Sequence, residues 1–372
     1  MKNFIYVTLL VASSIHCTPL TIHNLTLEQK IGQLFMVAAV ADEEIAKDFM
    51  QRKSYRLDKE YIEELITHYH IGGIIYLGRS DLEKQIQRTQ HFQNLSVIPL
   101  IIGQDLEPGR VGAARLPHDC NFPCNKTLGI IDNEENTYQS GVTIGKLCKR
   151  LGVHINFAPV ADVNNNPDNP VINDRSFGAE PELVARHAIA FARGLHDTGI
   201  IGCAKHFPGH GDTNTDSHTT LPMIPHDTAR LHEIELYPFK KLIAANIPTI
   251  MIGHLEIPAF EDQKNVPATV SHKIVTNLLR EELGFTGLII TDSLDMAGIT
   301  NYYSNGQAEL NALHAGNDVL LGSVDVPAAI AAIKQAIVDN LITEQEIDMH
   351  VEKILHIKNL VCNPSLNPNS PL

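Results

Sequence analysis

The sequence predicts an α/β protein folded as a single (β/α)8 (TIM) barrel. Eight short apolar segments recur along the chain, separated by longer segments of helical character; they are 34–40, 71–77, 100–104, 155–160, 201–204, 249–253, 288–290 and 319–321. These segments are continuously apolar rather than alternating, which is typical of parallel strands covered on both faces by helices. Eight strand–helix units are the repeat of this barrel. A doubly wound open sheet is the alternative, but no Gly-rich turn of the dinucleotide type follows the first segment.

Composition and charge narrow the class further. The chain has 372 residues, of which 44% are apolar, enough for one large core or two ordinary ones. No linker rich in Pro, Gly or Ser divides it, so we expect one domain over residues 25–360. The net charge of −14 argues against nonspecific binding to nucleic acid or anionic membranes. We therefore expect no nucleic-acid partner.

The first residues have the pattern of a signal peptide. Lys2 precedes the apolar run 4–12, and small residues follow it. Residues 1–17 therefore predict export to the periplasm or envelope, with the cytoplasm as the alternative. Cys17 is a candidate for lipid attachment, although the two residues before it are larger than those usual in lipoprotein signals.

The remaining sequence predicts no integral membrane span in the mature chain, because no later segment reaches about 18 uninterrupted apolar residues. Residues 363–372, rich in Asn, Pro and Ser, predict a frayed tail. Cys120 and Cys124 are the one close cysteine pair, and their spacing leaves a loop disulfide and two unpaired thiols equally open.

Three helices have recognisable N-termini. Asp132, Ser271 and Thr343 each precede a helical segment, and Asp132 and Thr343 are followed three positions later by Glu. Such residues satisfy the unpaired backbone N–H groups of a first turn. We therefore expect helices to begin at these three positions.

Polar residues follow five of the predicted strands. In a (β/α)8 barrel the active site lies at the C-terminal ends of the strands. Any one of these residues could be a hydrogen-bonded polar group without function, but their convergence at one end predicts an active site. They are Gln104, Asp105 and Glu107, then Asp162, Lys205 and His206, His254 and Glu256, and Asp292 and Asp295.

Segment 205–218, KHFPGHGDTNTDSH, has the densest chemistry in the chain, with three His, two Asp and one Lys. Gly209 and Gly211 permit unusual backbone angles, which predicts a long, mobile loop after the fifth strand. Asp216 lies two residues before His218, where a carboxylate can fix the tautomer of an imidazole and tune its basicity. Such a pair can exchange protons near neutral pH.

Composition alone leaves two other interpretations of this segment open. One is a His-rich surface turn without function. The other is a metal site built from His206, His210 and His218, although the spacing lacks the helical frame of HExxH and the segment contains the helix-breaking Pro208.

Three further segments supply charged groups. In GLIITDSLDMAGI, Asp292 leaves an apolar strand directly, a suitable place for a nucleophile, although it could also cap the next helix. QDLEPGRV supplies Asp105 and Arg110, and NDRSFG supplies Arg175. These side chains could bind a hydroxylated ligand or pair with one another at the rim.

Taken together and in this order, the segments resemble glycoside hydrolase family 3, and most closely its single-domain β-N-acetylglucosaminidases. The resemblance covers residues 25–360, and its most specific part is KHFPGHGDTNTDSH. It implies a (β/α)8 barrel and a retaining double displacement with Asp292 as nucleophile. It also implies His218 as general acid/base with Asp216 as its partner, and no metal or cofactor.

The resemblance implies a sugar-binding role for four more residues. Asp105, Arg175, Lys205 and His206 are expected to hold the sugar of the first subsite, terminal β-linked N-acetylglucosamine. Peptidoglycan-derived fragments and chitooligosaccharides are the two expected sources of this carbohydrate. Larger family members typically carry a second domain with a carboxylate acid/base, and the His-containing loop here favours the β-hexosaminidase group instead.

Two departures weaken one sugar-binding loop. The glycine pair usual after the Glu of the first segment is Pro108–Gly109 here, which makes a role for Arg110 less secure. A basic residue often found three positions later is Ala113, and Arg115 lies two positions beyond it.

Other functions stay open at this point. One is a metal-dependent barrel hydrolase that uses His206, His210, His218 and Asp292. Another is an inactive envelope protein that binds sugar without turnover. Phosphorolysis is a variant of the glycosidase, because a neutral His repels phosphate less than a carboxylate would. The sequence does not indicate the oligomeric state.

Overall fold

The computed structural model describes residues 19–51, 53, 56–109, 111–112 and 122–362. Several expectations lie outside these residues: the signal peptide and Cys17, the residues Arg110, Ala113, Arg115 and Cys120, and the tail 363–372. Among the described residues, Cys124, Cys148 and Cys203 form no disulfide. The open question of a Cys120–Cys124 disulfide stays untested because Cys120 lies outside them.

Eight parallel strands form the barrel, in the order β7-β6-β5-β4-β3-β2-β1-β8. They are β1 (Phe35–Ala39), β2 (Gly73–Tyr76), β3 (Ile101–Gln104), β4 (Ile155–Asn156), β5 (Ile201–Phe207), β6 (Thr249–Ile252), β7 (Leu288–Thr291) and β8 (Leu320–Leu321). β8 pairs with β1, and a parallel bridge between Ile290 and Val319 closes the ring next to β7. The predicted barrel is confirmed, and its closure excludes the open sheet. β5 is longer than predicted, and β4 and β8 are shorter.

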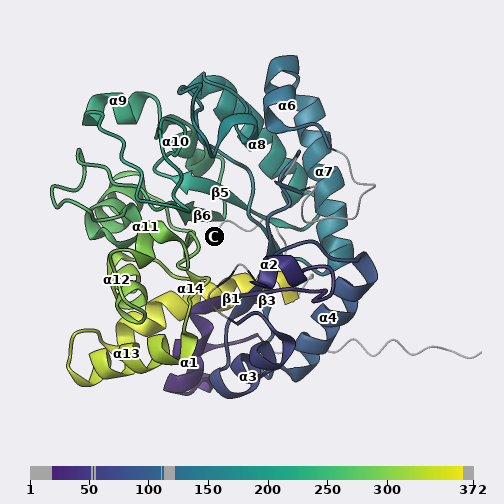
Figure 1. The fold of residues 1–372 in the computed structure, drawn as a ribbon, viewed down its shortest axis with the longest axis vertical. Helices are drawn as coiled ribbons and strands as arrows, with labels where there is room; N and C mark the ends of the chain where they lie inside the picture. Colours follow the sequence, from purple (N-terminus) through teal and green to yellow (C-terminus); the bar gives the residue numbers. More distant parts are fainter. Residues whose placement is uncertain (1–18, 52, 54–55, 110, 113–121, 363–372) are drawn as a thin grey trace, which may run out of the picture.

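Helices surround the strands in chain order (Figure 1). Ahead of β1 and between β1 and β4 lie η1 (Ile22–Asn24), α1 (Leu27–Gln33), α2 (Lys47–Gln51), α3 (Lys59–Tyr69), α4 (Leu82–Leu95), α6 (Asn125–Ile131) and α7 (Glu134–Leu151). From β4 to β7 come η2 (Asn173–Arg175), α8 (Pro181–His196), α9 (Thr228–Glu233), α10 (Tyr237–Ala244), η3 (Ala268–Val270) and η4 (Lys273–Glu282). The last are α11 (Ala297–Thr300), α12 (Gln307–Ala315), α13 (Val326–Val338) and α14 (Glu344–Cys362).

The strands are buried on both faces, as their continuous apolar sequences predict. Ile74, Ile102, Ile250 and Ile289 are completely buried. Each such side chain contributes roughly 1.5–3 kcal/mol relative to an exposed position. The core therefore holds the strand ends, and the residues that follow them, in fixed relative positions.

Two of the three predicted helix starts have the expected contacts. Thr343 and Glu346 form the capping pair of α14, and the Ser271 hydroxyl accepts from the Ile274 N–H at 3.3 Å before η4. The prediction for Asp132 is wrong by one residue, because Asn133 accepts from the Asn136 N–H and caps α7. Asp132 instead ends α6 with a φ of 48°, a left-handed conformation that Asp tolerates better than most residues.

The seam between β7 and β8 is held by a buried carboxylate. Asp318 accepts hydrogen bonds from the Ile289 N–H at 2.8 Å, from His350 Nδ1 and Lys353 Nζ at 2.9 Å each, and from Arg280. Burial opposes ionisation, but the bond from His350 and the charges of Arg280 and Lys353 lower the pKa of Asp318 to about 2. One side chain thus connects both strands of the seam with η4 and α14.

α14 lies across the N-terminal end of the barrel. Its Lys358 donates to Gln33 just before β1, and the Asn359 side chain exchanges two hydrogen bonds with the Leu20 backbone at 2.9 and 3.0 Å. Leu360 and Val361 line a cavity of about 590 Å³ at the starts of β5, β6 and β7. The first and last parts of the described chain therefore meet at the end of the barrel opposite the C-terminal strand ends.

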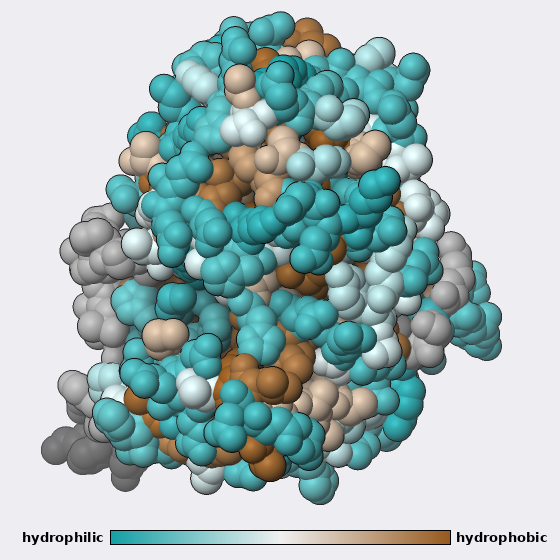
Figure 2. Space-filling view, turned by 90° about the vertical axis from the view of Figure 1, so that its left-hand side faces the viewer, coloured by the Kyte–Doolittle hydropathy of each residue, from teal (hydrophilic) through white to brown (hydrophobic). Residues whose placement is uncertain are grey.

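The face drawn in Figure 2 is mostly hydrophilic, with apolar residues visible between the hydrophilic ones, most extensively in its lower half. Within the described residues no helix is both long enough and apolar enough to cross a membrane.

Candidate active site

Two cations and two anions from three strand ends form the polar base of the site. Lys205 Nζ lies 2.8 Å from Asp105 and 2.6 Å from Glu107, and Arg175 makes two hydrogen bonds to Glu107 at 2.9 and 2.8 Å. Burial favours the neutral forms of Lys205 and Glu107, but the opposite charges around them raise the pKa of Lys205 and hold that of Glu107 well below its usual range. The structure thus brings the predicted Asp105, Arg175 and Lys205 together around Glu107.

Glu107 has a larger role than the sequence suggested. Its side chain is fully buried and serves as the counter-ion of both cations. The signal that could have identified it is electrostatic: two buried cations require a buried anion, and Glu107 follows Asp105 by two residues. Arg175 reaches it from the short turn η2, where its carbonyl accepts from Asn125 at 2.6 Å.

Asp162 organises the start of the His-containing loop. Its carboxylate accepts the backbone N–H groups of His206 at 3.1 Å and His210 at 2.7 Å, and lies 2.7 Å from His206 Nδ1. The other ring nitrogen of His206, Nε2, lies 3.4 Å from Arg175 Nη2. These contacts orient the His206 ring so that Nε2 faces Arg175.

His210 has a structural environment. It is buried, which lowers its pKa to about 4. Nδ1 lies 2.8 Å from the Thr213 hydroxyl and Nε2 lies 3.1 Å from the Ser217 hydroxyl. The neutral ring therefore joins the two halves of the loop.

The loop after β5 is fixed at its base and exposed at its tip. Asn169 donates to the His210 carbonyl at 2.9 Å, and Gly298 of α11 donates to the Ser217 carbonyl at 3.1 Å. Gly209 has the positive φ, 130°, that its prediction required. Gly211 is needed for a different reason, since a Cβ there would lie 1.8 Å from the Val163 carbonyl oxygen. The expected mobility of this loop stays a prediction.

The tip of the loop carries the predicted pair. His218 Nδ1 lies 2.7 Å from Asp216 Oδ1, which also accepts the His218 backbone N–H at 2.8 Å. Partial burial opposes ionisation of Asp216, but these two bonds lower its pKa. Because Nδ1 donates to the carboxylate, Nε2 is the nitrogen left for a ligand, and 61% of the His218 side chain is exposed.

Asp292 leaves β7 at the same end of the barrel. Its backbone N–H donates to Ile252 of β6 at 2.9 Å, and its Oδ1 accepts the Ser293 N–H at 2.8 Å. Burial alone would raise its pKa, but the imidazoles of His254, His206 and His218 and the Ser293 N–H lower it. An ionised carboxylate therefore faces the histidines at the mouth.

His254 supports the segment that follows β7, although no particular role was predicted for it. Burial lowers its pKa, so the ring is neutral at pH 7. Its Nε2 donates to the Ser293 carbonyl at 2.9 Å, which leaves Nδ1 to accept from the Thr269 hydroxyl at 2.7 Å. The peptide that follows Asp292 is thus held from β6.

The other predicted rim residues contact neighbours outside the charged base. Gln104 is buried against Gln85, and Glu256 accepts the Asn265 N–H at 3.0 Å. Asp295 pairs with Lys53 from the loop after α2 at 2.5 Å and accepts from Ser293 at 2.6 Å. These three residues shape the rim without joining the charged base.

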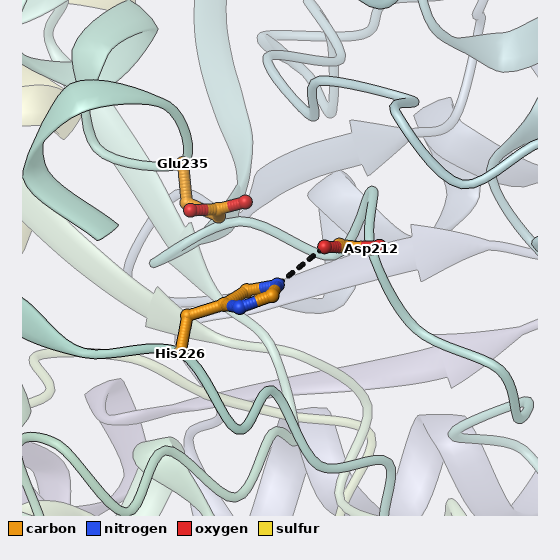
Figure 3. A group of neighbouring side chains, drawn as sticks. All are labelled: Asp212, His226 and Glu235. Carbon is orange, nitrogen blue, oxygen red and sulfur yellow. Dashed lines mark hydrogen bonds and ion pairs between the residues drawn. The ribbon is translucent and has the colours of Figure 1, made fainter. Parts of the chain in front are cut away.

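A second group of side chains lies beside the base of the loop (Figure 3). Asp212, His226 and Glu235 have ligand atoms within 4.8 Å of one another, and they are the one such group among the residues that the structure describes. Their atoms already have partners, since His226 Nε2 lies 2.5 Å from Asp212 and Arg230 donates to both Glu235 oxygens at 2.9 and 2.8 Å. The group is therefore an ionic network that ties the loop to α9, and it does not fit a metal ion.

The alternative of a metal site built from His206, His210, His218 and Asp292 finds no support in the described contacts of these residues. Both ring nitrogens of His210 and Nδ1 of His206 and His218 have hydrogen-bond partners in the protein. These four residues do not gather as a group of ligands in the described part of the chain.

Comparison with known proteins places this geometry in a family. The model "Glycosyl hydrolase family 3 N terminal domain" matches residues 26–357. A β-hexosaminidase A of Pseudoalteromonas piscicida is 34% identical over 327 residues, 80% of this chain and 54% of the relative. The β-hexosaminidase LpqI of Mycobacterium tuberculosis is 32% identical over 309 residues, 80% of this chain and 78% of that protein.

The solved structures agree. A glycoside hydrolase family 3 β-N-acetylglucosaminidase from Paenibacillus sp. aligns with a TM-score of 0.82 at 37% identity, covering 91% of this chain and 63% of that one. This chain thus spans less than two thirds of the Pseudoalteromonas and Paenibacillus proteins.

Proposed function

This chain belongs to glycosyl hydrolase family 3, and from that premise we propose that it is a retaining exo-β-N-acetylglucosaminidase. One observation carries the proposal: an ionised Asp292 and the exposed His218–Asp216 pair lie at the same barrel mouth, beside a base of paired charges. The activities for which the β-hexosaminidase and β-N-acetylglucosaminidase relatives are named support the choice of sugar.

The proposed reaction has two steps. Asp292 attacks the anomeric carbon while His218 Nε2 donates a proton to the leaving oxygen. The imidazole then takes a proton from water, which attacks the glycosyl-aspartate and releases the sugar with its original β configuration. Asp216 holds the Nδ1–H of His218 and stabilises the imidazolium, so the pair replaces the second carboxylate usual in retaining glycosidases.

The charged base is proposed as the first sugar subsite. Asp105 offers an acceptor, and Lys205 and Arg175 offer donors, to the hydroxyl groups of the sugar. Glu107 keeps both cations charged without contributing a free charge of its own. This arrangement suits an uncharged polyhydroxyl ligand better than an anion.

Substrate source and location are the broader part of the proposal. We expect peptidoglycan-derived fragments or chitooligosaccharides outside the inner membrane, in the periplasm or at the envelope. The support for location is the signal-peptide pattern of residues 1–17, and the support for source is the family resemblance.

The test is release of an aryl leaving group from a β-N-acetylglucosaminide and from the matching β-glucoside, with and without chelator and inorganic phosphate. Wild type should act on the acetamido sugar, resist chelator and yield free sugar, and Asp292→Ala should lose about 10⁴-fold in kcat. Loss of activity to chelator would support the metal-dependent alternative. A sugar phosphate as product would make the enzyme a phosphorylase, and silence on both sugars would support a binding protein.

A further inference from the structure

We propose that Asp162 is a positioning residue that fixes the tautomer of His206, so that His206 Nε2 accepts a hydrogen bond from a hydroxyl group of the sugar. This inference rests on the proposed function, because the first subsite is the place where His206 would meet a sugar. It adds a second layer to that subsite: a buried carboxylate that acts through an imidazole and does not itself touch the ligand.

The contacts of His206 select one tautomer. Asp162 is completely buried, and its Oδ2 lies 2.7 Å from His206 Nδ1. A carboxylate accepts hydrogen bonds, so Nδ1 carries the proton. On the other side of the ring, Nε2 lies 3.4 Å from Arg175 Nη2, which can only donate. Both neighbours therefore require Nδ1–H and an unprotonated Nε2.

The position of Nε2 gives this tautomer a use. His206 Nε2 lies beside Arg175, which only donates, and Arg175 shares its counter-ion Glu107 with Lys205. A sugar hydroxyl bound at this base needs an acceptor for its own proton. Asp105 supplies one acceptor, and His206 Nε2 supplies another when the hydroxyl takes the place of the long 3.4 Å contact from Arg175.

Asp162 also has a purely structural function, which the experiment must separate. The same carboxylate accepts the backbone N–H groups of His206 and His210 through Oδ1, at 3.1 and 2.7 Å. Removal of the whole side chain would disturb the loop base as well as the tautomer. An isosteric change separates the two effects.

Asp162→Asn is that change. Its side-chain oxygen can still accept both backbone N–H groups, while its NH2 group faces His206 Nδ1 and forces that nitrogen to accept. The ring proton then moves to Nε2, where it meets Arg175 and can no longer accept from a sugar. We expect kcat/KM for the aryl β-N-acetylglucosaminide to fall about 10- to 100-fold, the cost of one lost polar contact in a buried site.

Nitrogen-15 NMR of histidine-labelled protein reports the tautomer directly. The His206 signals are those missing from His206→Ala. Wild type should show a protonated Nδ1, Asp162→Asn a protonated Nε2, and added N-acetylglucosamine should shift Nε2 in wild type only. An Nε2–H tautomer in wild type, an unchanged tautomer in Asp162→Asn, or no response of Nε2 to the sugar would overturn the proposal.

A double-mutant cycle separates positioning from loop anchoring. In a His206→Ala background, Asp162→Asn should cost less than about threefold, because its effect passes through the imidazole. Asn169→Ala is the matched control: it removes another anchor of the loop base, the bond to the His210 carbonyl, and leaves the contacts of His206 intact. The loss of activity caused by Asn169→Ala should multiply with the loss caused by His206→Ala. The tautomer of His206 in Asn169→Ala should stay as in wild type.

If the losses of activity in Asp162→Asn and His206→Ala also multiplied, Asp162 would be only an anchor of the loop.

Failure of the proposed function would look different. Wild type would then release no sugar, whereas the tautomers of wild type and Asp162→Asn would still be measurable without turnover.

Discussion

At the scale of single residues, the site divides its chemistry between a sheltered carboxylate and an exposed imidazole. Asp292 lies beside three histidines that lower its pKa, whereas His218 sits at a loop tip with most of its side chain in solvent. In the proposed reaction the sheltered group stays ionised for attack. The exposed group gives its proton to the leaving oxygen in the first step and takes one from the attacking water in the second.

This division predicts how His218→Ala depends on the leaving group. A nitrophenolate departs without a proton, but a sugar alkoxide does not. We expect a loss of about 10²- to 10⁴-fold on a GlcNAc disaccharide and a much smaller loss on a nitrophenyl glycoside. Equal losses on both substrates would contradict the assignment of general acid.

Asp216→Asn should change the pH profile more than it changes binding. The pKa of the Asp216 carboxyl is lowered by its two bonds to His218, so the ionised group accepts the Nδ1–H above that pKa. Its replacement by an amide removes this charge beside His218, which should lower kcat and alter the pH profile of kcat/KM. KM should change little, and a profile identical to that of wild type would show that the pair is not coupled.

The sequence predicted the primary residues better than their partners. Asp105, Arg175 and Lys205 come together as expected, because parallel strand ends converge on one rim. The functions of Glu107, Asp162 and His254 depend on contacts made across 68, 44 and 39 positions of the chain. Their positions after strands placed these residues on the predicted rim. The partners that they bind follow from the packing of neighbouring strands and have no local sequence signal.

At the scale of elements, the segment after β5 works as a fixed base with an exposed end. Asp162 and Asn169 hold its first half, α11 holds Ser217, and the Asp212–His226 contact ties it to the segment before α9. The spacing of KHFPGHGDTNTDSH predicted a loop but not these anchors. They come from the segment after β4, from α11 and from the segment before α9, which the loop meets only in the folded barrel.

His226→Ala should loosen this loop. It removes the contact to Asp212 and leaves Arg230 as the nearest cation, at 3.7 Å. We expect faster hydrogen–deuterium exchange in residues 208–220. We also expect a loss of about three- to tenfold in kcat, because the proposed catalytic pair, Asp216 and His218, is held less firmly. His226→Gln can still donate to Asp212 and is the matched control. Unchanged exchange in His226→Ala would remove the network from any role in the loop.

At the scale of the whole molecule, the barrel is closed at the seam between β7 and β8 by backbone hydrogen bonds and by one buried side chain. The Thr291 N–H donates to the Val319 carbonyl and the Val319 N–H to the Ile289 carbonyl, each at 3.0 Å. The Asp318 side chain bonds to β7, η4 and α14 around them. The eight apolar segments predicted the ring but not the means of its closure. Asp318 precedes the last segment, and its four donors lie 29 to 38 positions away.

This seam should be sensitive to acid. The folded-state pKa of Asp318 is about 2 against an ordinary value of 3.8, so its contribution is complete above the ordinary value and declines as pH falls toward 2. The difference in unfolding free energy between wild type and Asp318→Asn should shrink by about 1 kcal/mol between about pH 5 and pH 3. Urea denaturation measures it, with Glu352→Gln, an exposed change on α14, as control. A constant difference would show that the pKa of Asp318 is not depressed.

The meeting of Leu20 with Asn359 under the barrel also fixes how the molecule can be held. Anything joined to the described chain ahead of residue 19 or beyond residue 362 starts from the N-terminal end of the barrel, which α14 covers. The full height of the barrel lies between that end and the mouth. A protein tethered there, to a lipid, a bead or a fused domain, would present its mouth away from the support. The proposed carbohydrate substrate could then approach the site without the tether in its path.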